Sequence, residues 1–208
     1  MRRPLTLLLA TATVAAAGIG LSAAPALASR SAPADQVINL TFPVTGSTFI
    51  KKINSSISLG PGTLASSADL TNSTLTATLT LPPATASFKE LGFITVTATT
   101  KLVQVGQATG TFNFNTNTVT TTATAMLQLT SLNVGGIPIP VGSSCETSPA
   151  TITVASQPGF TFGLGGNLTG TYTIPSFRRC GLATVLINLT LPGPGNTITL
   201  TLGKSTLG

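Results

Sequence analysis

The segment from residue 70 to residue 81 reads Leu70-Thr71-Asn72-Ser73-Thr74-Leu75-Thr76-Ala77-Thr78-Leu79-Thr80-Leu81. From Thr74 onward, a threonine alternates with an apolar residue at every step. Because successive side chains of a β-strand point to opposite faces, the apolar residues lie on one face and the threonines on the other. A strand of this kind has one face in a core and one in water, which is typical of an antiparallel sheet.

The same two-residue period recurs on both sides of this segment, with turn signals rich in glycine, proline and asparagine about every 8–12 residues. We predict strands at residues 37–42, 48–59, 70–81, 93–105 (bent or bulged near Lys101), 110–114, 119–130, 152–154, 159–164, 168–174, 182–191 and 197–202. The predicted turns are residues 45–47, 60–62, 115–117, 165–166 and 193–196. Residues 84–91 are the only place where a helical turn is expected.

Strands of this number and spacing predict an all-β fold. We expect an antiparallel β-sandwich, or a flattened barrel, of about ten strands with one disulfide. The strict polar alternation argues against parallel βαβ units. Residues 37–208 are expected to form a single β domain, since their number lies within the usual range for one domain. Residues 29–36, rich in alanine and serine, are expected to form a flexible leader.

The N-terminus has the layout of a secretory signal. Met1-Arg2-Arg3 is basic, residues 5–20 are apolar, and Ala26-Leu27-Ala28 is a small-x-small cleavage sequence. We expect cleavage after Ala28, so that residues 1–28 are the signal peptide and the protein is secreted or extracellular. An uncleaved membrane anchor is the alternative, but polar residues interrupt the apolar run and no basic stop-transfer cluster follows. After cleavage no segment is apolar for long enough to span a membrane as a helix.

The chain has two cysteines, Cys145 and Cys180. In an oxidising compartment we expect them to form a structural disulfide, whereas a redox pair is more often Cys-x-x-Cys. A bridge across a loop of about 35 residues stabilises a fold by roughly 3–4 kcal/mol. The same stretch, residues 135–181, also holds the only tyrosine, Tyr172.

The composition limits the partners. Charged residues make up 7% of the chain, and the basic residues outside the signal are scattered rather than arranged in a stripe. Neither Lys51-Lys52 nor Arg178-Arg179 is interleaved with aromatic residues, so we expect no nucleic-acid binding. Weak attraction to an anionic cell wall remains compatible with the net charge of +6, of which Arg2 and Arg3 leave with the signal.

The residues needed for common enzyme chemistries are missing from the sequence. The chain has no histidine, which removes the Ser-His-Asp arrangement and the commonest zinc ligand. The four carboxylates are Asp35, Asp69, Glu90 and Glu146. A glycosidase needs two of them facing each other, and we interpret all four as surface acids. We therefore predict no catalytic residues, no metal site and no cofactor.

Several stretches resemble a family of secreted proteins of actinobacteria such as Streptomyces. They are residues 59–64 (Leu-Gly-Pro-Gly-Thr-Leu), 79–83 (Leu-Thr-Leu-Pro-Pro), 92–93 (Gly-Phe), 141–145 (Val-Gly-Ser-Ser-Cys), 170–175 (Gly-Thr-Tyr-Thr-Ile-Pro), 180–181 (Cys-Gly) and 193–196 (Gly-Pro-Gly-Asn). The resemblance covers nearly all of the mature chain and implies export, the cysteine pair and a β fold. The family has no assigned activity, so it implies no catalytic residues.

Three functions fit these observations. The first is an exported, non-enzymatic β protein, a monomer that binds or coats a cell-envelope component or carries a hydrophobic ligand, with possible association with the cell wall. A carrier needs an apolar cavity. Six phenylalanines either line such a cavity or pack in the core: Phe49, Phe93, Phe112, Phe160, Phe162 and Phe177. The second is a subunit of an outer-envelope β-barrel pore, against which the lack of aromatic girdles counts. The third is a secreted hydrolase with an unrecognised carboxylate site, which replacement of Glu90 and Glu146 with glutamine would test.

Overall fold

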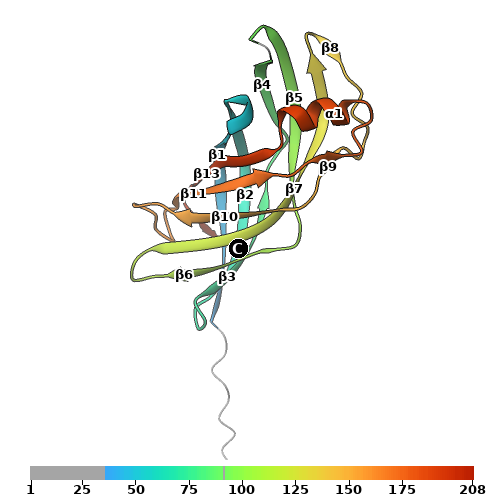
Figure 1. Ribbon diagram of the computed structural model, residues 1–208. Coiled ribbons are helices and arrows are strands. Elements are labelled where there is room, and N and C mark those ends of the chain that lie inside the picture. Colours follow the sequence, from blue (N-terminus) through green and yellow to red (C-terminus); the bar gives the residue numbers. More distant parts are fainter. Residues whose placement is uncertain (1–35, 91) are drawn as a thin grey trace, which may run out of the picture. The chain divides into compact units, whose positions relative to one another are not determined.

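The computed structural model describes residues 36–90 and 92–208 (Figure 1). The expected signal peptide, residues 1–28, and residues 29–35 of the expected leader lie outside the described residues. The described residues belong to one compact unit. Its strands are β1 (Val37–Ile50), β2 (Ser55–Asp69), β3 (Thr74–Thr80), β4 (Ala84–Glu90), β5 (Ile94–Gln104), β6 (Ala108–Asn113), β7 (Thr118–Val134), β8 (Ile137–Pro138), β9 (Glu146–Thr147), β10 (Ala150–Ser156), β11 (Gly166–Ile174), β12 (Phe177–Arg178), β13 (Gly193–Leu202) and β14 (Thr206–Leu207).

The described residues also form a 3-10 helix, η1 (Lys51–Ile53), and an α-helix, α1 (Ala183–Thr190). Four of the fourteen strands have two residues each, which leaves ten strands of six residues or more. The all-β class, the antiparallel pairing and the disulfide predicted from the sequence are confirmed.

Eight strands form a closed antiparallel barrel. Their order around it is β7, β10, β11, β13, β1, β2, β3 and β6, and β6 pairs with β7 to complete the ring. Strand β7 is the longest of the described strands, and its second half pairs with β5. Strand β5 also pairs with β4, and this hairpin lies outside the ring. A closed barrel leaves none of its eight strands with a free edge.

Alternation decides which side chains enter the barrel. In β3, Leu75, Ala77 and Leu79 pack with the core while the threonines between them face outward, as the sequence predicts. The bend expected near Lys101 is also present, since the pairing of β5 with β7 shifts register between Thr99 and Thr100. The loop predicted at residues 115–117 joins β6 to β7.

Several predicted turns instead lie inside strands. Residues 45–47 are part of β1 and residues 60–62 are part of β2, where the pairing of the two strands shifts register between Val44 and Gly46. Residues 193–196 open β13. The glycines in these segments let neighbouring backbones approach closely where the strands bend. The prediction failed because it interpreted each of these glycines as part of a turn.

The strand predicted at residues 48–59 is two strands. β1 ends at Ile50 and β2 begins at Ser55, with η1 and Asn54 forming the turn between them. Asn54 has a φ of 47°, a left-handed conformation that asparagine tolerates better than most residues.

Two predictions of element type are wrong. The helical turn expected at residues 84–91 is strand β4, whose inward residues Ala86 and Phe88 join the core. The strand expected at residues 182–191 is helix α1, in which Ala183 and Ile187, four residues apart, are buried.

The strand predicted at residues 159–164 is absent from the described part of the chain. That segment turns between Gly159 and Gly165, both of which have positive φ, and it holds one isolated bridge between Thr161 and Gly165. It connects β10 to β11 at the barrel end that lies away from α1 (Figure 1).

Candidate functional site

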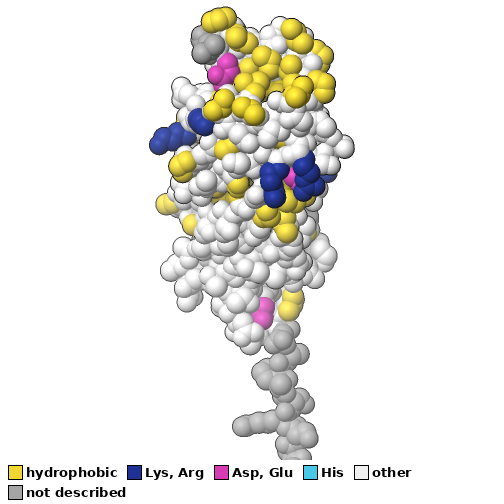
Figure 2. All heavy atoms as spheres, turned by 45° about the vertical axis from the view of Figure 1, so that its right-hand side comes forward, with side chains coloured by type: hydrophobic (Ala, Val, Ile, Leu, Met, Phe, Trp, Pro, Cys, Tyr) yellow, Lys and Arg dark blue, Asp and Glu magenta, His cyan; other side chains and the backbone are white. Residues whose placement is uncertain are grey.

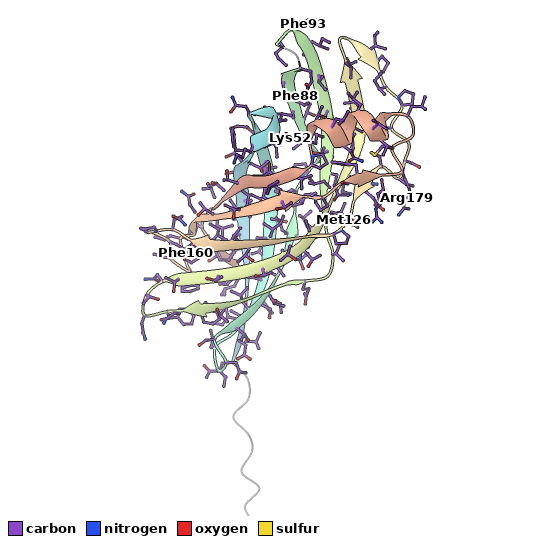
Figure 3. The ribbon with its side chains drawn as sticks, in the orientation of Figure 1. Lys52, Phe88, Phe93, Met126, Phe160 and Arg179 are labelled. Atoms are coloured by element: carbon purple, nitrogen blue, oxygen red, sulfur yellow. A yellow bond between two sulfur atoms is a disulfide. The ribbon has the colours of Figure 1, made fainter. Side chains whose placement is uncertain are left out.

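The inward side chains of the barrel are mostly apolar and leave two cavities. The first lies on the side of α1, and we call it the capped cavity. The second is lined partly by phenylalanines, and we call it the phenylalanine cavity. Figure 3 shows Phe88, which lines the first, and Phe160, which lines the second, toward opposite ends of the barrel.

The capped cavity has a volume of about 80 Å³. Its walls come from the strands of the ring and from the β4–β5 extension, and Ile53, Phe177 and Leu191 close it on the side of α1. Leu191 directly follows the last residue of α1, so the position of the helix sets the roof of this cavity.

The phenylalanine cavity has a volume of about 100 Å³. Phe42, Phe112, Phe160 and Phe162 line it together with aliphatic side chains of β2, β3 and β13. The ring of Phe162 contacts those of Phe112 and Phe160, with centroids 5.6 Å and 5.5 Å apart, respectively. Edge-to-face contacts of this kind fix the shape of the wall.

Four side chains line both cavities: Leu102, Ala125, Ile152 and Ile198. We call this shared wall the waist. Because β5, β7, β10 and β13 each supply one of these residues, the waist crosses the barrel interior. The two cavities are therefore consecutive compartments of one apolar interior.

The polar side chains that line the capped cavity are those of four threonines and of Tyr172, whose hydroxyl is bonded to one of the threonines. The Tyr172 hydroxyl oxygen lies 2.7 Å from Thr48 Oγ1, and the Thr48 hydroxyl donates to the carbonyl oxygen of Thr197 at 2.8 Å. Since the Thr48 hydroxyl has one hydrogen, Tyr172 donates the bond between the two side chains. Burial raises the pKa of Tyr172, and the hydrogen bond with Thr48 opposes that shift in part.

Three polar side chains, Ser66, Gln104 and Thr121, are among the residues that line the phenylalanine cavity, and the amide of Gln104 is bonded to the backbone. Gln104 Nε2 donates to the carbonyl oxygens of Ala77 (2.9 Å) and Gly106 (2.8 Å), and Gln104 Oε1 accepts from the N–H of Leu79 (2.8 Å). The amide thus holds β3 to β5 across the wall and offers little to a ligand. An apolar cavity with its polar groups satisfied favours an apolar occupant over water.

Helix α1 is held over the capped cavity by one amide side chain. Asn188 Oδ1 accepts from the N–H of Phe177 (2.7 Å), and Asn188 Nδ2 donates to the Phe177 carbonyl oxygen (3.0 Å). The side chain pairs with β12 much as a neighbouring strand would. Phe177 is 2% exposed and lines the cavity, so this contact links the helix to the cavity wall.

The disulfide fastens the same region. Cys145 and Cys180 are bonded, their Cα atoms lie 4.3 Å apart, and both are fully buried. Cys180 lies between β12 and α1, and Cys145 precedes β9, which pairs with β12. The predicted bridge is therefore present, and it joins the start of the roof to the barrel wall.

The carboxylates lie apart from the cavities. Glu146 forms an ion pair with Arg179 at 3.2 Å, and Glu90 ends β4. Asp69 accepts bonds from Thr71 and Asn72 in the β2–β3 turn, and the Asn72 side chain in particular lowers the pKa of that carboxyl. Figure 2 shows the acidic side chains of this face separated from one another. Asp35 lies outside the described residues.

Metal ligation finds no support in the described residues, among which no three His, Cys, Asp or Glu side chains gather. Within residues 36–90 and 92–208, no helix has the length and apolarity needed to cross a bilayer.

The six phenylalanines singled out in the sequence divide between the cavities and the surface. Phe112, Phe160 and Phe162 line the phenylalanine cavity, and Phe177 lines the capped cavity. Phe93 is 72% exposed at the β4–β5 turn. Phe49 is half-buried and follows the inward-facing Thr48 in β1, so it lies on the outer face.

Sequence reasoning missed the waist and the Thr48–Tyr172 pair. Tyr172 stands out as the only tyrosine, but its partner is 124 residues away in the chain. Only the pairing of β13 with both β1 and β11 brings these two side chains together. Comparison of the chain with family models, with curated proteins and with solved structures gave no match.

Proposed function

We propose that this protein is an exported, non-enzymatic binding protein that carries a small aliphatic molecule inside a flattened barrel. The observation that carries the proposal is the pair of apolar cavities that share the side chains of the waist. Closed eight-stranded barrels are wide enough to be filled by side chains or to hold one small ligand. Here the side chains leave space on both sides of Ala125.

The shape and polarity of the interior favour a chain-like ligand. Two compartments in sequence suit a molecule that extends through the waist rather than a compact ring. The free acceptor capacity of Tyr172 in the capped cavity suits a ligand with one hydroxyl group, since the tyrosine already donates its hydrogen to Thr48. A long-chain alcohol has this chemistry.

The outer face of the barrel supports a carrier in water rather than a pore. Thr74, Thr78 and Thr80 of β3 are exposed while the apolar residues between them face inward. A barrel in a lipid bilayer has the opposite pattern, with an apolar band outside and a polar interior.

Export and a monomeric state are part of the proposal. A fully buried disulfide fits an oxidising compartment such as the cell exterior. The expected signal at residues 1–28 and the resemblance to secreted actinobacterial proteins also support export, and association with the cell envelope is part of the proposal. The ion pair of Glu146 with Arg179 and the turn bonds of Asp69 give these carboxylates structural partners, which supports a role without catalysis.

A titration with 1-dodecanol tests the proposal. Because the chain has no tryptophan and Tyr172 is its only tyrosine, tyrosine emission reports on the capped cavity directly. We expect dodecanol to change this emission in a saturable way and to raise the melting temperature, since a ligand that binds the folded state stabilises it.

The variant Ala125→Leu narrows the waist and should weaken binding. Displacing about two methylene groups of the ligand costs about 1.6 kcal/mol, which is about a fifteenfold rise in Kd. Thr120→Leu, on the exposed outer face of the same strand, is the matched control and should bind like wild type. Absence of saturable binding, or equal Kd values for the two variants, would refute the proposed ligand class.

A further inference from the structure

The barrel end that carries α1 also carries an exposed apolar surface, which we call the apolar tip. Its side chains come from the β4–β5 turn, from β8 and from α1: Phe93, Ile137, Leu182, Val185, Leu186 and Leu189. Leu182 is 99% exposed and Val185 is 70% exposed. Figure 2 shows apolar side chains gathered at this end, and Figure 3 shows Phe93 there.

Backbone contacts hold parts of the apolar tip side by side. Val96 of β5 pairs with Val134 of β7, so the β4–β5 turn lies beside the β7–β8 turn. The N–H of Gly135 donates to the Thr95 carbonyl oxygen at 2.8 Å, which ties the two turns together. The disulfide then connects the segment after β8 to the start of α1.

Helix α1 differs from the rest of the outer surface. The barrel strands present threonine to water, but α1 presents leucine and valine on its outer face while Ala183 and Ile187 pack inward. No charged residue occurs between Gly181 and Leu202. An apolar helix face is normally packed against another apolar surface, and a contiguous exposed apolar surface marks an interaction site.

The charges near the apolar tip are mainly basic. Lys52 Nζ donates to the Pro192 carbonyl oxygen at 3.3 Å, just beyond the end of α1. Lys89 Nζ donates to Thr95 Oγ1 at 2.7 Å on the hairpin that carries Phe93. The segments that form or adjoin this end hold five basic side chains and two carboxylates: Lys51, Lys52, Lys89, Arg178, Arg179, Glu90 and Glu146. Of these, Arg179 and Glu146 pair with each other.

We propose that the apolar tip inserts into the surface of an anionic lipid bilayer, with Lys52 and Lys89 facing the lipid headgroups. An apolar face rimmed by lysines is the arrangement by which surface helices bind in the interfacial layer. Basic side chains beside that face are attracted to anionic lipids. The inference does not depend on the cavity ligand, since none of the six side chains of the apolar tip lines either cavity.

Sedimentation with lipid vesicles tests this docking. The mass of the protein recovered from culture medium is first measured by mass spectrometry. This mass establishes that residues 1–28 are absent from the sample. It is then mixed with vesicles of phosphatidylcholine alone or of phosphatidylcholine with phosphatidylglycerol. We expect binding to the mixed vesicles that weakens as salt is added, because salt screens the basic side chains.

Three variants separate the contributions. The triple variant Leu182→Gln, Val185→Gln and Leu189→Gln removes the exposed apolar face of α1 and should lower partitioning at least tenfold. The double variant Leu164→Gln and Leu207→Gln changes exposed apolar residues outside the apolar tip and should bind like wild type. The double variant Lys52→Gln and Lys89→Gln should lose most of its preference for phosphatidylglycerol. Circular dichroism melts establish that each variant is folded.

Three results would overturn the inference. One is absence of binding by the folded wild-type protein to either kind of vesicle. Another is equal binding by the triple variant and its control. The third is a combined result: sedimentation velocity shows that the wild-type protein is a dimer and the triple variant a monomer, and neither binds vesicles. That result would assign the apolar tip to self-association.

Discussion

Removing the Cys145–Cys180 bridge is expected to destabilise the whole domain through its unfolded state. The bridge joins residues 35 apart in the chain. Closing a loop of that length lowers the entropy of the unfolded chain by about 13 cal/mol/K, which corresponds to about 4 kcal/mol at 25 °C. The loop contains β10 and β11, two strands of the closed ring, so the constraint acts on part of the barrel itself.

Thermal unfolding measures this effect. For a domain of this size each kcal/mol shifts the melting temperature by about 2–4 °C, so the loss is expected to be about 8–16 °C. The samples are the double variant Cys145→Ala and Cys180→Ala and the wild type unfolded and refolded under reducing conditions. The alanine variant should melt slightly lower than the reduced protein, because it also loses the packing of two fully buried sulfur atoms.

The loop argument makes a claim that can fail. A fall of less than about 3 °C in both samples would refute it, since that corresponds to about 1 kcal/mol or less. Amide hydrogen exchange supplies a second readout. If amide exchange accelerates only in α1 while the melting temperature stays constant, the disulfide holds α1 in place but does not stabilise the barrel against unfolding.

Two further predictions concern glycine packing and the buried tyrosine. Gly170→Ala should destabilise the fold by about 1–3 kcal/mol in urea unfolding, because an added Cβ meets the Thr153 carbonyl oxygen of the next strand. Gly163→Ala is the control. Because the space around Gly163 is open, this variant should change stability by less than about 1 kcal/mol. The raised pKa of Tyr172 means that the folded state keeps the phenolic proton when the unfolded state releases it, so stability should fall as pH rises above about 10. Phenolate absorbance measures this ionisation without interference from other tyrosines, and Tyr172→Phe should flatten the decline; an equally steep decline in that variant would assign it to other groups.

The period of two in the sequence predicts most of the barrel. Strands whose apolar residues alternate with threonine, such as β3, have their predicted inner faces. The hairpin loop at residues 115–117 was predictable because asparagine tolerates the left-handed conformation, and Asn117 adopts a φ of 51°. These features depend on local residues only.

Helix α1 shows where local reasoning fails. The run of valine, leucine and isoleucine at residues 185–187 fits a strand as well as a helix. Packing decides between them, because Ala183 and Ile187 meet the core at the spacing of one helical turn. The long strands β11 and β13 already pair directly with each other, so this segment has no place between them.

The candidate site was beyond sequence reasoning for a different reason. Its walls depend on closure of the ring through the pairing of β7 with β10, and no local pattern encodes that pairing. The waist depends on the alanine at position 125 lining the same space as Ile152 and Ile198, which other strands of the ring supply. The sequence could predict a disulfide and an apolar interior, but not the space left inside.

The pairing of β1 with β13 also limits when the barrel can assemble. Thr48 and Thr197, 149 residues apart, lie on adjacent strands, so the ring stays open until β13 is available. Contacts this distant in sequence form slowly, because loop closure must precede them. A chain emerging stepwise from a ribosome or an export channel would keep its first strands unpaired on one side throughout that time. Late closure therefore follows from the order of the strands along the chain, since β13 is the last strand of the ring.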